Sequence, residues 1–467
     1  MRILLVQPEY LTEGIGFRLA ALPEPLHLEV VAATVPDHDV RILDMRLDGN
    51  LDAALRKFWP EMVAVTALTT EVYAALEILQ QVKSFSPEIF TVAGGHHATL
   101  LPQNFMLPQV DAIAVGEAEL MFSQLARAVA DRRGLDGVSN IIWQDRDREF
   151  VRNSFKKTKV DMEKLPLPRR DLTEEYRNEY FFLFDKPDTS IATSRGCPYR
   201  CNFCSVHEFY QGSTSQMPPE RVLTNISSVT TKHITFVDDN FLMNYRRENS
   251  IADLIRTERI KLSYSMECRT DSIVRHPELV EKWVDIGLYA VLLGLEGVCD
   301  KTIKRINKSC NIVTNNQAIK ILQDNGIIIW GAFIVDPDWT EDDFKQLRDY
   351  VSEKEITHTQ FTILTPLPGT SLYRDRFEDL LTHDYSCFDT LHAVLPTRLP
   401  REIFYQNFAK LYHQSDIGPY YDLVQAGKMT IEDCKRGKIM LDAMADWERY
   451  IEKDPILGSK HVYSINC

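Results

Sequence analysis

The chain has 467 residues and a net charge of −14 at pH 7, which excludes the basic surface that tight, sequence-independent binding of nucleic acid requires. Hydrophobic residues at 44% and charged residues at 26% describe an ordinary globular protein, long enough for two or three domains. Because no run of 18 apolar residues occurs and the first residues lack the small-residue cleavage site of a signal peptide, we expect no membrane-spanning helix and no signal peptide. The nine cysteines do not resemble a disulfide framework, so we expect a cytoplasmic protein.

The first 135 residues alternate β-branched runs with segments of helical spacing. We expect strands over 2–8, 40–45, 62–68, 90–95 and 112–117, and helices over 26–35, 70–85 and 118–132. This alternation predicts a doubly wound, Rossmann-like α/β domain with a parallel sheet. In such a domain, ligands bind beyond the carboxyl ends of the strands.

Residues 136–188 interrupt the alternation, and we interpret them as a linker. A small hairpin is expected over 139–153, and a proline-punctuated connector over 164–172. The stretch "EYFFLF" over 179–184 is unusually aromatic. Its rings either pack between domains or contact a flat, apolar substrate.

Residues 189–395 return to the alternation at a wider period. Strands are expected over 190–196, 233–239, 261–268, 289–297, 327–336 and 360–369. Six β/α repeats predict a partial (β/α)6 barrel, with its chemistry at the carboxyl ends of the strands. Residues 396–467 are predicted to form a small, helical C-terminal region.

Three cysteines are concentrated in the segment "SRGCPYRCNFCS" over 194–205, while the other six are scattered singly, unlike a disulfide framework. Cys197, Cys201 and Cys204 have the spacing C-x3-C-x2-C. A structural zinc site needs four ligands, and His207 is the nearest residue that could complete one. A [4Fe–4S] cluster held by only three thiolates leaves one iron open to an exogenous ligand, and we favour this interpretation.

The cysteine segment, with Phe203 before the last cysteine, resembles the signature of radical S-adenosylmethionine enzymes. The resemblance covers roughly residues 189–395. It implies that S-adenosylmethionine chelates the open iron and is cleaved to a 5′-deoxyadenosyl radical.

Further segments of the same half resemble that family in the expected order. "FVDDNF" (236–241) implicates Asp238 and Asp239 at the methionine amino group, and "MECRTD" (266–271) directs Glu267 and Arg269 to the ribose and carboxylate. "LGLEG" (293–297) adds Glu296, and "TPLPGT" (365–370) resembles the segment of the sixth strand. A zwitterionic ligand needs both a carboxylate and a guanidinium, although each of these residues alone fits a buried structural ion pair equally well.

The first 135 residues resemble the cobalamin-binding domain that precedes many radical S-adenosylmethionine domains, through 65–73, 91–103 and 115–119. The resemblance implies that threonine hydroxyls serve the nucleotide tail and that a glycine turn runs beside the corrin. The residues concerned are Thr66, Thr69, Thr70, Gly94 and Gly95. His96 and His97 are either metal ligands or part of an exposed polar turn.

One departure concerns cobalt. The D-x-H-x-x-G motif that supplies a histidine ligand from below is absent, so the sequence does not support such a ligand. An alternative is a degenerate domain that holds no cofactor.

Together the two resemblances imply a cobalamin-dependent radical methylase acting on an unactivated carbon, and residues 6–26 and 391–412 look most like hopanoid methylases of the C-3 type. The alternatives are a cobalamin-assisted cyclase or oxidase, acting for example on a tetrapyrrole, and a non-catalytic cobalamin or redox sensor. The expected partners are a small-molecule or lipid substrate and a reductant such as flavodoxin or ferredoxin. A lipid substrate would imply transient contact with a membrane.

Overall fold

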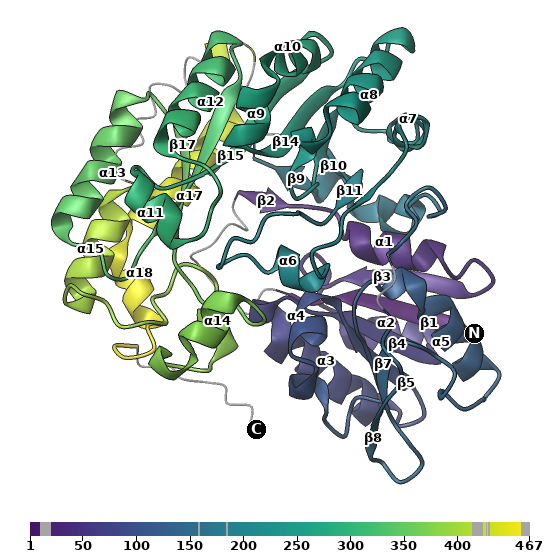
Figure 1. Ribbon diagram of the computed structural model, residues 1–467. Coiled ribbons are helices and arrows are strands. Elements are labelled where there is room, and N and C mark those ends of the chain that lie inside the picture. Colours follow the sequence, from purple (N-terminus) through teal and green to yellow (C-terminus); the bar gives the residue numbers. More distant parts are fainter. Residues whose placement is uncertain are drawn as a thin grey trace.

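The structure is a computed structural model that describes residues 1–9, 20–156, 159–183, 185–412, 424–425, 427 and 430–458. The segment 6–26, which resembles hopanoid methylases, therefore lies partly outside the described residues. Figure 1 shows two α/β units side by side, the amino-terminal one in purple to blue and the barrel in teal to yellow. The predicted fold class, a doubly wound domain followed by a partial barrel, is confirmed.

The amino-terminal sheet has seven strands in the order β3-β1-β4-β5-β6-β7-β8. Its parallel strands are β1 (Arg2–Gln7), β3 (Asp39–Asp44), β4 (Met62–Thr66), β5 (Phe90–Gly94) and β6 (Ala112–Ala114). The predicted hairpin forms β7 (Ile141–Gln144) and β8 (Phe150–Arg152), and it pairs antiparallel with β6. We had placed this hairpin in the linker, but it extends the sheet, because Ile141 and Ile142 are fully buried in the cores on its opposite faces.

Helices cover both faces of this sheet. α1 (Leu26–Ala33) and α5 (Phe122–Ala130) pack on one face. α2 (Leu51–Phe58), α3 (Val72–Phe85) and α4 (Gly95–Leu100) pack on the other. Neither α2 nor α4 was predicted from the sequence. α4 has only six residues, too few to show hydrophobic periodicity, whereas α2 has eight residues, the same length as α1, and was overlooked.

The second sheet has six parallel strands in sequence order. They are β10 (Asp188–Ile191), β13 (His233–Phe236), β14 (Ser263–Arg269), β15 (Leu288–Glu296), β16 (Ile328–Val335) and β17 (His358–Ile363). The outer helices are α7 (Pro219–Ser227), α8 (Tyr245–Thr257), α9 (Thr270–Arg275), α10 (Pro277–Asp285), α11 (Asp300–Arg305), α12 (Ile312–Asp324) and α13 (Glu341–Glu353). Alternation along β14 sends Tyr264, Met266 and Cys268 into the helical layer and leaves Glu267 and Arg269 for the barrel interior.

Smaller elements complete this unit. Two short antiparallel strands, β11 (Ser194–Arg195) and β12 (Ser215–Gln216), flank the cysteine segment, which is followed by α6 (Val206–Phe209). Beyond α14 (Ser371–Asp375), the C-terminal region contains α15 (Arg401–Lys410), α17 (Ile431–Ala445) and α18 (Trp447–Glu452), as predicted. In the described part of the chain, no helix has both the length and the apolar character needed to cross a bilayer.

A buried ionic cluster joins the two units. Glu24, just before α1, pairs with Arg170 at 3.1 Å and with Arg177, both from a 3-10 helix over Arg170–Glu179. Glu24 also accepts a hydrogen bond from the backbone N–H of Ser190 in β10 at 3.1 Å. Since buried charges persist only when they are paired and hydrogen-bonded, this cluster fixes the first helix of one unit to the first strand of the other.

The aromatic stretch packs between the two units, which agrees with the first of its two interpretations. Tyr180 is fully buried between the units and donates a hydrogen bond to Asp44 at 3.2 Å. Phe181 and Phe182 form β9, which pairs with β2 (Ala21–Leu22), and the ring of Phe182 lies 6.1 Å from that of Trp330 in the barrel. Phe184 lies outside the described residues.

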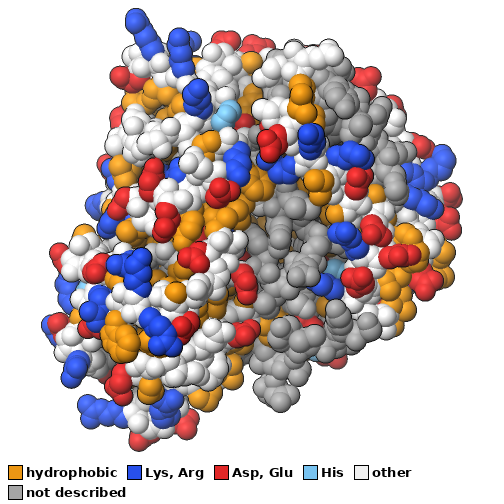
Figure 2. All heavy atoms as spheres, turned by 180° about the vertical axis from the view of Figure 1, so that it is seen from behind, with side chains coloured by type: hydrophobic (Ala, Val, Ile, Leu, Met, Phe, Trp, Pro, Cys, Tyr) orange, Lys and Arg blue, Asp and Glu red, His pale blue; other side chains and the backbone are white. Residues whose placement is uncertain are grey.

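On the face seen in Figure 2, acidic and basic side chains are interspersed, and hydrophobic side chains gather along the middle. No large field of one sign covers the visible, described surface.

Candidate functional site

The cysteine loop lies between β11 and α6, and its three thiols are partly accessible. Gly196 begins the loop with a φ of +81°, and a Cβ there would lie 2.1 Å from the carbonyl oxygen of Ser213, so only glycine fits. Burial raises the pKa of all three thiols, and that of Cys204 to about 12. The thiolate form therefore needs a bound metal to compensate its charge, which suits a cluster held by the loop.

The zinc alternative is not supported by the geometry. Within the described ranges, no three His, Cys, Asp or Glu side chains are close enough together to hold a single metal ion. His207 lies against Gly212, 2.7 Å from the position that a Cβ on that glycine would take. A [4Fe–4S] cluster needs no fourth protein ligand here, because each of the three thiols binds a different iron and the fourth iron stays open.

Arg269 places a positive charge beside the cysteine loop. Its guanidinium lies 3.5 Å from the ring centroid of Tyr199, and its Nη1 lies 3.9 Å from Cys201 Sγ. Its Nε donates to Asp271 Oδ1 at 2.8 Å, and the Tyr199 hydroxyl also donates to Asp271. The predicted partner of the ligand's carboxylate is thus held at the edge of the loop by two fixed contacts.

Three predicted carboxylates converge on the barrel interior near this loop. Glu267 faces the open interior of the barrel, where desolvation by the surrounding protein, and then the charges of Asp239 and Glu296, raise its pKa to about 7. Burial also raises the pKa of Asp239 to about 6, although its carboxylate accepts the Gly196 N–H at 2.7 Å. An ammonium group placed among these carboxylates would relieve their repulsion, as the amino group of S-adenosylmethionine would.

Sequence reasoning missed Lys308, a buried residue beside this group. Its Nζ donates to Glu296 Oε1 at 2.6 Å and to the carbonyl of Gly294 at 2.7 Å. Glu296 has a φ of +62°, in the region that non-glycine residues rarely adopt, where the pairing of β15 with β16 is irregular. The ion pair holds this strained carboxylate in place, and no family segment that we recognised contains the lysine.

Asp238 does not reach the site that we predicted for it. Its carboxylate is fully buried and accepts hydrogen bonds from the backbone N–H and hydroxyl of Thr193 and from the hydroxyl of Ser194, each at 2.6 Å. These bonds satisfy the group within the protein, so it supports the strand before the cysteine loop instead of binding a cofactor.

Phe203 is part of the cysteine loop, and its side chain packs into the barrel. It packs against Ile306, Ile334, Leu364 and Leu372, which form a small apolar cluster inside the barrel. Its place in the motif is thereby explained by packing at the end of the sixth strand.

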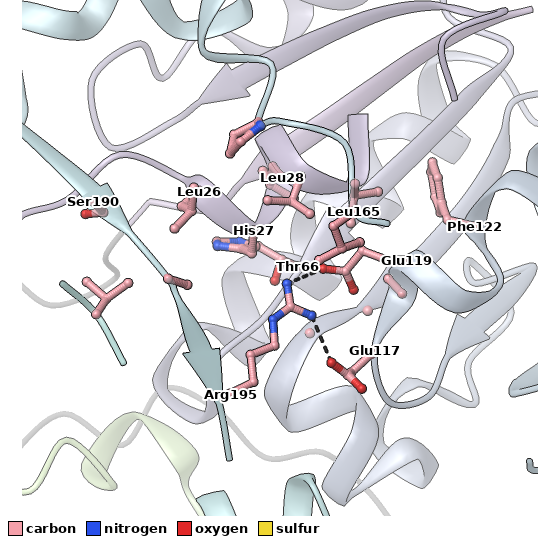
Figure 3. Close-up of a pocket in the computed structure, with 18 of the residues that line it drawn as sticks. Leu26, His27, Leu28, Thr66, Glu117, Glu119, Phe122, Leu165, Ser190 and Arg195 are labelled. Carbon is pink, nitrogen blue, oxygen red and sulfur yellow. Dashed lines mark hydrogen bonds and ion pairs between the residues drawn. The ribbon is translucent and has the colours of Figure 1, made fainter. Parts of the chain in front are cut away.

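A cavity of about 420 Å³ lies between the two units, at the carboxyl ends of β1, β4, β5 and β6 (Figure 3). Its deep part is apolar, with walls from the sheet, α1 and α5 that include Leu5, Leu28, Val92 and Phe122. Its mouth is polar and carries Glu117 and Glu119. A slot with an apolar floor and a polar mouth suits cobalamin, which joins an apolar base to an amide-rimmed corrin.

Arg195 bridges the units at this mouth. Its guanidinium donates to Glu117 Oε1 at 2.9 Å and to Glu119 Oε1 at 2.6 Å (Figure 3). Because Arg195 directly precedes Gly196 and the cysteines, the ion pairs connect the cavity to the cysteine loop. The sequence contained both parts, but only the fold brings them together.

The predicted cobalamin residues divide into two groups. Thr66, Gly94 and Gly95 line the cavity, whereas Thr69, Thr70, His96 and His97 do not. Gly95 has a φ of +91°, and a Cβ there would lie 2.5 Å from Thr66 Oγ1, so the turn requires glycine.

The expectation of an exposed polar turn at the two histidines is wrong for His97. Its ring is fully buried, with Nδ1 3.2 Å from Thr69 Oγ1 and Nε2 3.0 Å from Asn104 Oδ1. His96 lies at the domain interface, where Nε2 is 3.2 Å from Ser205 Oγ and the ring stacks on Phe209. Both rings are therefore engaged in packing, because α4 begins where we had expected only a turn.

Two family models match the chain in the order of the two units. The B12 binding domain matches residues 14–126, and the radical SAM superfamily matches residues 191–351.

Several curated proteins are similar over most of their length. The hopanoid C-3 methylase of Methylococcus capsulatus is 31% identical, over 83% of this chain and 75% of that protein. An uncharacterised methyltransferase of Pyrococcus horikoshii is 27% identical over 99% of both chains. An anaerobic magnesium-protoporphyrin IX monomethyl ester cyclase of Rubrivivax gelatinosus is 25% identical, over 85% of this chain and 73% of that protein.

Solved structures share the fold at low identity. One is the radical S-adenosylmethionine methyltransferase TsrM of Kitasatospora setae, with a TM-score of 0.66 and 18% identity. The match includes 81% of this chain and 76% of that protein. The cobalamin-dependent S-adenosylmethionine radical enzyme OxsB, with a TM-score of 0.70 and 16% identity, covers 97% of this chain and is covered to 79%.

Proposed function

Because the chain belongs to the cobalamin-dependent radical S-adenosylmethionine methylases, we propose that it methylates an unactivated carbon of a hopanoid lipid, at C-3. The family makes the chain a radical methyltransferase with a [4Fe–4S] cluster, S-adenosylmethionine and cobalamin as cofactors. This assignment replaces the sensor alternative. The substrate is the part that we propose.

The observation that carries the proposal is an apolar wall inside the barrel. Along β16, Trp330, Ala332 and Ile334 alternate onto one face, and Ile334 packs on the same apolar cluster as Phe203 of the cysteine loop. Trp330 forms a second apolar cluster with Leu183, Leu292 and other side chains at the far end of this wall. A rigid, apolar polycycle would bury its surface against such a wall.

The residues of the site have distinct tasks. When bound, the cluster and S-adenosylmethionine supply a primary carbon radical that removes a hydrogen atom, and cobalamin supplies a methyl group. Cys197, Cys201 and Cys204 would hold the cluster, with Arg269 beside one thiol. Glu267 and Asp239 would bind the ammonium of S-adenosylmethionine, and Gly94, Gly95 and Thr66 would border the cobalamin. The protein thus positions two cofactors and excludes water, and no side chain needs to act as an acid or base.

A tetrapyrrole cyclase or oxidase is the second candidate, and the similarity to the Rubrivivax cyclase favours it. A tetrapyrrole is also flat, so the apolar wall alone does not separate the two substrates. The reaction products separate them. Methylation forms S-adenosylhomocysteine and 5′-deoxyadenosine together and adds one methylene unit to the substrate, whereas cyclisation forms no S-adenosylhomocysteine.

The test combines two experiments. Lipids from cells with and without the protein are compared by mass spectrometry, and the anaerobically purified, cobalamin-loaded protein is incubated with hopanoids or with porphyrin esters. Loss of a methylated hopanoid on deletion, with both cofactor products formed from hopanoids, is the expected result. Turnover of porphyrin esters alone would overturn the proposal.

An acidic reductant such as flavodoxin or ferredoxin would suit the surface outside the cysteine loop. Asn202 Nδ2 donates to the carbonyl of Arg305 at 3.0 Å, and Asn307 Nδ2 to that of Arg200 at 2.6 Å, so α11 ends against the loop. Arg200, Lys301 and Lys304 are exposed there, on a chain of net charge −14. Slower turnover of Lys304→Glu with flavodoxin, but not with a chemical reductant, is the expected result. Transient membrane contact stays a prediction.

A further inference from the structure

His27 occupies a place in the interdomain cavity that no motif marks. It is the second residue of α1, and Figure 3 shows its ring in the cavity whose mouth carries Arg195, Glu117 and Glu119. Within the described residues, it is the one histidine that lines this cavity. The next five residues of α1 are buried, whereas the His27 side chain is accessible.

The imidazole of His27 is available as a ligand. Although the His27 side chain is accessible from the cavity, the surrounding protein desolvates the ring, and this desolvation, followed by the charge of Arg46, lowers its pKa to about 4, so the ring keeps a lone pair at physiological pH. Neither ring nitrogen has a hydrogen-bond partner in the part of the chain that the structure describes. His96 and His97 differ, because their ring nitrogens contact Ser205, Thr69 and Asn104.

The backbone around His27 is held from both sides. Glu24, three residues before it, pairs with Arg170 and Arg177. Glu29, two residues after it, is fully buried and accepts a hydrogen bond from the Thr173 hydroxyl.

Pro23 is held as well, since its carbonyl accepts a hydrogen bond from Arg46 Nη2 at 2.9 Å. Two buried carboxylates are more than a short helix needs for docking, because apolar side chains would serve at lower cost. The same contacts hold the backbone of His27 in a fixed place, as a metal ligand requires.

We propose that His27 is the axial ligand of cobalt on the face turned towards the amino-terminal sheet. Neutral imidazole is a common ligand of first-row transition metals, cobalt included. The apolar lining from Leu5, Leu28 and Phe122 suits the benzimidazole base of the cofactor, which then leaves this position to the protein. The inference goes beyond the proposed function, and its test uses no substrate, so a wrong lipid would not affect the outcome.

The test is the electron paramagnetic resonance of the cob(II)alamin-loaded protein. One axial ¹⁴N ligand splits each resolved cobalt line into three, and ¹⁵N splits it into two. Protein labelled with [¹⁵N]histidine should therefore convert the triplets of the unlabelled protein into doublets. Unsplit lines would overturn the proposal, and so would triplets that persist after labelling, because the nitrogen would then be that of benzimidazole.

Variants give a second measurement. His27→Gln should lose the nitrogen splitting, and its cobalamin affinity should fall about tenfold. The control is His38→Gln, in the turn before β3 at the amino end of the sheet, which should keep the full splitting. If His27→Gln does not fold or bind cobalamin, the labelling experiment on the unmodified sequence decides alone. Splitting that is retained in a folded His27→Gln would contradict the proposal.

Discussion

The cysteine loop takes its three thiols from eight consecutive positions, whereas the interdomain cavity draws its walls from residues as far apart as Leu5 and Asp239. Around the loop the contacts are ionic and each group has a specific partner, as with Arg269 or Lys308. In the cavity most of the wall is apolar, and polar groups are confined to the mouth. A local site of this kind fails when one ligand is lost, while an assembled cavity fails when its backbone or its interface shifts.

Removal of one thiol should distinguish the cysteine loop from the cavity most clearly. Cys201→Ala should reduce methyl transfer and cleavage of S-adenosylmethionine below detection, because the cluster loses one of its three protein ligands. Iron content should fall while cobalt content stays unchanged, as measured by elemental analysis after anaerobic loading. Cys434→Ala, in α17, is the matched control and should keep both metals. A parallel loss of cobalamin in Cys201→Ala would show that the two regions are not separable.

A change in the cavity should have the converse effect, with loss of cobalamin and retention of iron. Gly95→Ala forces a Cβ to within 2.5 Å of Thr66 Oγ1 at a φ of +91°, a strain of about 1–2 kcal/mol or more. Cobalamin content should fall at least tenfold while the iron content stays unchanged. Gly49→Ala, where a Cβ meets nothing within 4 Å, serves as the control. Full cobalamin occupancy in Gly95→Ala would exclude a close approach of the turn to the corrin.

Arg195 is the residue at which the two regions should respond together. Arg195→Gln leaves Glu117 and Glu119 without their cation, and breaking such a largely buried pair costs about 3 kcal/mol. We expect a lower melting temperature, altered spectra of both the cluster and cobalamin, and about tenfold slower turnover. Arg56→Gln removes a solvent-exposed ion pair and controls for loss of charge alone. A change in the spectrum of only one cofactor would contradict the proposal that Arg195 connects the cavity to the cysteine loop.

The smallest effect concerns pH. Since the pKa of Glu267 is raised to about 7, its carboxylate forms only as the pH passes neutrality, and affinity for S-adenosylmethionine should rise about tenfold from pH 6 to pH 8. The same raised pKa makes the folded state hold a proton that the unfolded state releases. Its contribution to stability is therefore fully present below about pH 4.5 and is lost as the pH rises towards 7. Glu267→Gln should flatten both profiles, as measured by calorimetry. If affinity in Glu267→Gln still depends on pH as before, Asp239 would be the group responsible for that dependence.

The loop could be predicted because its information is contiguous. Spacing identified Cys197, Cys201 and Cys204, and alternation located the parallel strands of both sheets, although the antiparallel hairpin was predicted as part of the linker. The error at Asp238 has a physical reason, because a carboxylate next to a predicted site can as well be satisfied by Thr193 and Ser194 of a neighbouring strand. Only the fold shows which of the two adjacent acids faces inward.

The cavity could be predicted only in part. Thr66, Gly94 and Gly95 were predicted from the resemblance to cobalamin-binding domains, and the structure places them in the cavity wall. Glu119, Arg195 and His27 come from three separate segments, and the ion pair that unites two of them has no pattern in the sequence. Likewise, Lys308 lies 12 residues after Glu296, in a loop whose path periodicity does not predict.

The ionic cluster around Glu24 has a consequence for biosynthesis. The amino-terminal sheet is complete at β8, yet Glu24 and Glu29 on its first helix still lack Arg170, Thr173 and Arg177 when residue 152 has been made. The Ser190 N–H that also binds Glu24 is translated later still. Until then, the first helix would bury carboxylates without partners, so its docking waits for the start of the barrel. The cavity between them is consequently a late product of translation, and cobalamin loading follows synthesis of the connector.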